Sequence, residues 1–165
     1  MIIEDPSVFP GNIVQALDSS LQEIDPDIKV FRRPLRPTDP VQSIGIVATQ
    51  WIPNEESYEM RGAFSPGAGL PTIGMYLVGI QVFVKDMDEV RGLAVHCTMS
   101  QLVKSRLFND PVVRLSLSSL TCVLDGVTEK AKRWGVRTQR FVSNEISGQY
   151  HFLSSLEFWL ETETH

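Results

Sequence analysis

The stretch of sequence that decides the fold is Met75-Tyr-Leu-Val-Gly-Ile-Gln-Val-Phe-Val-Lys85, a strand pattern followed at once by a helix pattern over Asp86–Phe108. The positions between the main apolar series hold Leu77 and Phe83 as well. Apolar side chains on both faces are typical of a strand in the middle of a sheet. We therefore predict a central strand whose main apolar face consists of Tyr76, Val78, Ile80, Val82 and Val84.

Acidic and basic residues delimit the long helix predicted over Asp86–Phe108. Asp86 and Asp88 suit its N-terminal end, and Lys104 and Arg106 suit its last turn, because each charge opposes the helix dipole there. The sequence Asn109-Asp110-Pro111 then ends the helix, since proline cannot continue it.

Two apolar stripes on this helix are rotated relative to each other. A helix that is apolar on two sides packs against more than one partner. The second partner is either another layer of the same chain or a neighbouring subunit, and the sequence leaves both open. The first stripe consists of Val90, Leu93, Ala94 and Cys97, and the second of Val95, Met99, Leu102 and Val103.

The chain before the central strand predicts one shorter helix and two strands. Phe9–Ile24 has the apolar spacing of one helical face and is followed by Pro26. Asp27–Phe31 is expected to be a short strand and Ser43–Trp51 a longer one. Between them, Arg32–Pro40 holds three prolines in nine residues and is predicted to be an extended connector.

The segment 61–73 is rich in glycine and proline, and it predicts a flexible surface loop at the tip of a hairpin. Structureless loops of this length in a compact domain are usually functional or disordered. Because Phe64 and Leu70 are apolar residues in a segment with few charges, we expect this loop to dock on another protein.

The last third of the chain predicts a hairpin. Lys130–Ile146 and Tyr150–Glu161 both alternate, with Gly148 at the turn, and Trp134, Val136 and Val142 are expected on one face. The apolar segment Leu115–Leu124 is of uncertain type. We predict a single α+β domain over residues 1–165, a mostly antiparallel sheet with one long and one shorter helix packed on one side.

The composition excludes several classes of protein. A net charge of −5 argues against a general nucleic-acid-binding protein, which would be basic. The N-terminus lacks the basic and apolar regions of a signal peptide, and no apolar run approaches the ~20 residues that cross a bilayer. We expect synthesis in the cytoplasm and no membrane contact. Cys97 and Cys122 fit buried small side chains, and a disulfide between them stays open.

The sequence contains no pattern that predicts an enzyme. His96, His151 and His165 lack the neighbouring ligands or acids of a metal or catalytic site. Gly67-Ala68-Gly69 lacks the lysine of a phosphate loop, and Glu55–Glu56 reads as solvated charge. We therefore expect no catalytic residue, no metal and no cofactor.

A basic cluster stands out in an otherwise acidic chain. It consists of Lys130, Lys132, Arg133, Arg137 and Arg140. Three interpretations remain open: an exposed polar face, a subunit interface that pairs the arginines with a neighbour's acids, and a weak contact with nucleic acid.

The order of these segments resembles the tail terminator proteins of long, non-contractile-tailed bacteriophages. The similarity runs from the N-terminal helix through Tyr76-Leu-Val-Gly-Ile-Gln-Val-Phe-Val84 to the closing strands. Those strands are Ala131-Lys-Arg-Trp-Gly-Val-Arg-Thr-Gln-Arg-Phe-Val142 and, after Gly148-Gln-Tyr150, Phe158-Trp-Leu-Glu-Thr-Glu163. The similarity covers nearly the whole chain but includes no motif of functional residues. Other neck and head-completion proteins of phages share parts of it, and a small α+β enzyme and a ligand-binding α+β domain are the remaining alternatives.

The resemblance implies a structural virion protein that forms a ring, typically a hexamer, on the end of the tail tube. Such a ring stops addition of the tail tube protein and offers a surface to the head-completion protein, while DNA only passes through its lumen. From the residues themselves we expect the subunit interface to involve the long helix and the basic strand. The expected interface residues are Val95, Met99, Leu102, Arg133, Arg137 and Arg140, with Phe64 and Leu70 for docking on the tube or head.

Overall fold

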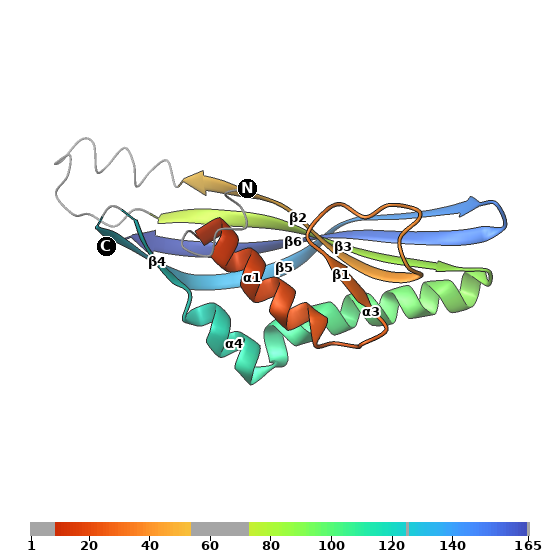
Figure 1. Cartoon of the computed structure of the whole chain (residues 1–165), viewed down its shortest axis with the longest axis horizontal. Coiled ribbons are helices and arrows are strands. Elements are labelled where there is room, and N and C mark those ends of the chain that lie inside the picture. The colour runs from red at the N-terminus through yellow and green to blue at the C-terminus, as the bar shows by residue number, and fades with distance from the viewer. Residues whose placement is uncertain (1–8, 54–72, 125, 165) are drawn as a thin grey trace.

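The computed structural model describes residues 9–53, 73–124 and 126–164. These residues form a six-stranded sheet with the strand order β1-β2-β3-β6-β5-β4. Three helices lie along one side of it, with α3 running along the length of the strands and α4 continuing beyond the end of α3 toward β4 (Figure 1). The elements are α1 (Phe9–Gln22), β1 (Lys29–Phe31), β2 (Gln42–Pro53), β3 (Ile73–Asp86), α3 (Glu89–Asn109), α4 (Pro111–Ser118), β4 (Thr121–Leu124), β5 (Val127–Ile146) and β6 (Gln149–Thr164).

The predicted α+β class is confirmed. The described strand pairs are antiparallel except β1–β2, which is parallel, and β3 lies in the interior of the sheet between β2 and β6 as expected. The segment of uncertain type resolves into the short helix α4 and the strand β4. No helix in the described ranges is both long and apolar enough to cross a membrane. The loop around 61–73, with Phe64 and Leu70, lies outside the described residues up to the start of β3 at Ile73.

One core fills the space between the helices and the sheet. Alternate residues of β3 and β6 face the helices, as the period of two predicts, and Val78 and Phe158 are fully buried there. From the helix side, the core receives Ile13, Leu17 and Leu21 of α1, Met99, Val103 and Leu107 of α3, and Val113 and Leu117 of α4.

Local chemistry explains where α3 begins and ends. The Asp88 side chain accepts a hydrogen bond from the Arg91 backbone N–H and caps the first turn. Asp110 follows the last residue of α3 and also caps α4, because its carboxylate accepts from the backbone N–H groups of Val112 and Val113. Pro111 occupies the first turn of α4, where its missing N–H costs nothing.

A bulge in β5 corrects one prediction about its faces. Trp134 and Val136 face the helices, as their partners Leu160 and Phe158 do. An irregularity between Thr138 and Arg140 then shifts the register, so that Val142 pairs with Leu153 on the opposite face. The expectation that Val142 shares a face with Trp134 was wrong because an inserted residue reverses the alternation.

The proline-rich connector between β1 and β2 covers part of the sheet face that has no helix. The Leu35 backbone N–H donates to the Gln81 side-chain oxygen at 2.8 Å. Gly45 lies beneath the connector, and a Cβ there would come within 2.8 Å of the Arg33 carbonyl oxygen. Arg33 and Asp39 form a paired hydrogen bond that closes the connector.

The two cysteines are free thiols. Cys122 is buried, as predicted, whereas Cys97 is exposed. The prediction for Cys97 was wrong because α3 turns a different face to the sheet, one that includes Gly92, His96 and Met99. Gly92 permits this approach, since a Cβ at that position would lie 2.6 Å from the Phe152 ring.

Candidate assembly surfaces

Two cross-strand ion pairs organise the basic strand on the face of the sheet away from the helices. Arg133 lies opposite Glu161 and donates to its carboxylate at 2.8 Å. Two residues further along, Gly135 lies opposite Trp159, and a Cβ on Gly135 would overlap the indole ring.

The second ion pair repeats this geometry on the other side of Trp159. Arg137 lies opposite Glu157 and donates to its carboxylate at 2.8 Å, and Gln139 donates to the same group at 2.6 Å. We call the pairs Arg133–Glu161 and Arg137–Glu157, with Trp159 between them, the Arg–Glu ladder. Cross-strand pairing of opposite charges stabilises a sheet modestly.

The ladder gives Arg133 and Arg137 partners in their own chain. Their carboxylates are largely covered while both guanidinium groups stay exposed. Arg140, in contrast, is exposed, and within the described parts of the chain it forms no ion pair. Of the three arginines expected at a subunit interface, Arg140 is therefore the one whose charge is free to meet a neighbour.

Most of the outer edge of β5 has no strand beside it. The pairing with β4 ends at Lys130, so that in the described structure the edge over 132–146 is unpaired. Phe141 and Ile146 on this edge are each about half exposed. Unpaired edges offer backbone N–H and C=O groups to another chain, and bulges and charges such as those of β5 restrict which chain can pair.

The outer side of α3 is exposed, and a stripe along it carries no charged side chain, while Arg91 at the margin of this stripe pairs with Asp86. Val90 is 78% exposed, and Cys97 and Phe108 lie on the same side of the helix, away from the sheet. A solvated helix face normally carries charges. We call this the outer α3 face, and it consists of Val90, Ala94, Cys97, Thr98, Gln101, Ser105 and Phe108.

The outer α3 face only partly matches the residues expected from the sequence. Met99 is 3% exposed and belongs to the core, so its side chain is not available to a neighbour in the folded chain. Val95 is half-buried against the same core. Leu102 is partly exposed beside the outer α3 face and remains a candidate residue for the subunit interface.

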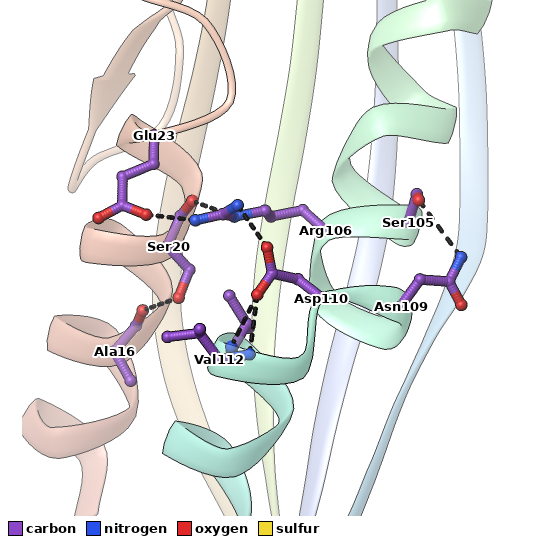
Figure 2. Close-up of polar contacts among 9 residues, drawn as sticks. Ala16, Ser20, Glu23, Ser105, Arg106, Asn109, Asp110 and Val112 are labelled. Carbon is purple, nitrogen blue, oxygen red and sulfur yellow. Dashed lines mark hydrogen bonds and ion pairs between the residues drawn. The ribbon is translucent and has the colours of Figure 1, made fainter.

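A single arginine joins the three helices (Figure 2). Arg106 of α3 donates to the Ser20 carbonyl of α1 at 3.2 Å and to Asp110 at 2.6 Å, and it also bonds Glu23. Asp110 in turn accepts the backbone bonds that begin α4, including that from Val112 at 2.9 Å. The sequence predicted Arg106 only as a charge suited to the last turn of α3 and missed this junction. The i,i+4 spacing to Asp110 was the available signal.

Beside this junction, a groove of about 430 Å³ runs between α1 and α4. A second hollow of about 440 Å³ lies on the other side of Arg106 and includes Leu102 and Pro111. We call the first hollow the α1–α4 groove, and it is lined by Asn12, Gln15, Ala16, Ser19, Ser20, Glu23, Arg106, Val112, Val113, Ser116 and Leu120.

The buried histidine of α3 has a structural environment. His96 Nε2 lies 2.9 Å from the Ser154 hydroxyl, and its ring packs against Phe141 and Phe152. Burial lowers the pKa of His96, while a hydrogen bond to the Val82 backbone opposes that shift. Elsewhere in the described residues, no group of three or more potential metal ligands comes together.

No family model and no curated protein matches the chain. Among solved structures, it is similar to a chain of the virion of a native gene transfer agent (GTA) particle, with 11% sequence identity and a TM-score of 0.36. The match covers 90% of this chain and 91% of that chain. A similarity of this size does not establish a shared function.

Proposed function

We propose that this chain is a structural virion protein and that it acts as a tail terminator: a ring that caps a full-length tail tube. The observation that carries the proposal is the outer α3 face, a long exposed stripe of uncharged residues with the paired Arg91 at its margin. The unpaired edge of β5 supports it, since both features require a protein partner more than a small ligand. The particular role of terminator rests on the order of segments in the sequence.

The work of such a ring is non-covalent. Each subunit would present one surface to the tube and another to the head side, and tube growth would stop because the ring does not offer the surface that tube subunits bind. The protein needs no catalytic group for this role, and we propose that it is not an enzyme. A homomeric ring requires heterologous contacts, in which two different patches of each subunit meet.

Two measurements test the proposal. Mass measurement in solution with negative-stain imaging should show rings, with a hexamer expected. Purified protein added to isolated, unfinished tails should cap one end and prevent further addition of the tube protein. Binding to filled heads instead of tail ends would replace the terminator with a head-completion role. A protein that stays monomeric and binds neither structure would refute an assembly function.

A further inference from the structure

We infer that the outer α3 face of one subunit packs into the α1–α4 groove of the next subunit. This inference rests on the proposed ring and names the surfaces that close it. The outer α3 face is convex, apolar in part and without a partner in the described structure. The α1–α4 groove is the concave counterpart on the same chain. Helices commonly bind grooves lined by other helices in this way.

The groove suits a helix in size and lining. Small side chains form much of its surface, at Ala16, Ser19, Ser20 and Ser116, and small residues let a helix approach closely. Val112 on α4 lines the groove, is largely exposed and would be covered by the incoming helix. At a rise of 1.5 Å per residue, the α1 wall of the groove spans about 21 Å over 14 residues and the α4 wall about 12 Å over 8 residues, so the groove accommodates about two turns of the 21-residue α3.

The charges of the two surfaces are compatible. Among the described residues that line the groove, only Glu23 and Arg106 are charged, and they pair with each other. The residues of the outer α3 face carry no charge, and Arg91 at its margin pairs with Asp86 of its own chain. Packing these surfaces together therefore leaves no unpaired charge away from water, which is the usual obstacle to burying a surface.

Charges near the ends favour one orientation. The α1 end of the groove is acidic, because Glu23 is followed by Asp25 and Asp27. The incoming α3 begins with Asp88 and Glu89, and Lys104 lies near its other end. The acidic start of α3 is then directed away from Asp25 and Asp27, and Lys104, which donates to Thr138 in its own chain, lies nearer to them. This orientation makes α3 of one subunit parallel to α1 of the next and places Cys97 near the middle of the groove.

A cysteine cross-link tests this contact. Cys97 is already an exposed free thiol on the outer α3 face, and Ser116 lies exposed in the groove. The variant Ser116→Cys should form intersubunit disulfides under mild oxidation. Because the contact runs head to tail, a non-reducing gel should show a series of covalent oligomers up to the size of the ring, and a reductant should return them to monomers.

Two controls accompany the cross-link. Cys97→Ser added to Ser116→Cys should abolish this series of covalent oligomers. Thr38→Cys, an exposed position in the connector, should not produce one. Rings that form normally, with no more cross-linking at position 116 than at position 38, would overturn this contact and leave the ring proposal standing. Cross-linked dimers alone would overturn the head-to-tail arrangement. An absence of both rings and cross-links would refute the ring and the contact together.

Discussion

Replacing Arg106 with methionine should loosen the junction of the three helices without adding bulk. The variant loses the bond to Asp110, a group about one quarter exposed, and the bond to the Ser20 carbonyl, which belongs to a buried residue. Each is worth about 1 kcal/mol net, while the pair with the well-exposed Glu23 adds at most a few tenths. We expect a loss of about 2 kcal/mol in the free energy of unfolding, or roughly 4–8 °C in Tm.

Urea unfolding followed by circular dichroism measures this loss directly. Glu23→Gln is the matched control, because it removes only the exposed partner, and it should cost less than about 0.5 kcal/mol. A similarly small loss for Arg106→Met would refute the assignment of Arg106 as the link between α1, α3 and α4. A loss as large in Glu23→Gln would show that the exposed pair contributes more than its geometry indicates.

Three further predictions concern the ladder, the outer α3 face and the buried histidine. Gly135→Ala should cost about 1–3 kcal/mol and change the tryptophan emission spectrum, because the new methyl group displaces the Trp159 ring; unchanged stability would contradict the packing. Val90→Glu should abolish ring formation in sizing experiments and leave the unfolding midpoint of the monomer unchanged, whereas Val41→Glu, also at an exposed valine, should still form rings. The contribution of His96 to the free energy of unfolding should be fully present above the ordinary His pKa of about 6.5 and fall as the pH drops below it, because the folded state holds the pKa of His96 lower and the unfolded chain binds the proton. Unfolding curves measured from about pH 7.5 to 5 should show a weaker pH dependence in His96→Gln. An equally steep dependence in the variant would refute this assignment.

The long elements could be predicted from the sequence because their signals are local. The alternation in 75–85 and the acidic start of the following helix define β3 and α3 to within a few residues. The turn at Gly148 and the alternation on either side of it likewise define the β5–β6 hairpin. In each case the residue propensities, the capping residues and the period of the apolar residues indicate the same element, so tertiary contacts do not change the secondary structure.

The surfaces could not be predicted, because they depend on which side of an element meets the sheet. Both sides of α3 hold apolar residues, and the buried side also holds Gly92 and His96, which no apolar count selects. The bulge near Thr138 leaves no mark in the composition of β5. The partners of Arg133 and Arg137 depend on strand register, which is set by the whole hairpin. Sequence patterns thus defined the elements, and pairing and packing decided which residues remain exposed.

Asp110 has a consequence for how this architecture can vary. Its side chain caps the start of α4 and holds Arg106, and Asp110 is the single residue between α3 and α4. The angle at this elbow sets the width of the α1–α4 groove. Lengthening the elbow by one residue would change that width and would also rotate Val113 and Leu117, which α4 contributes to the core. The groove and the core beneath α4 are therefore coupled through Asp110, and a change in one is transmitted to the other.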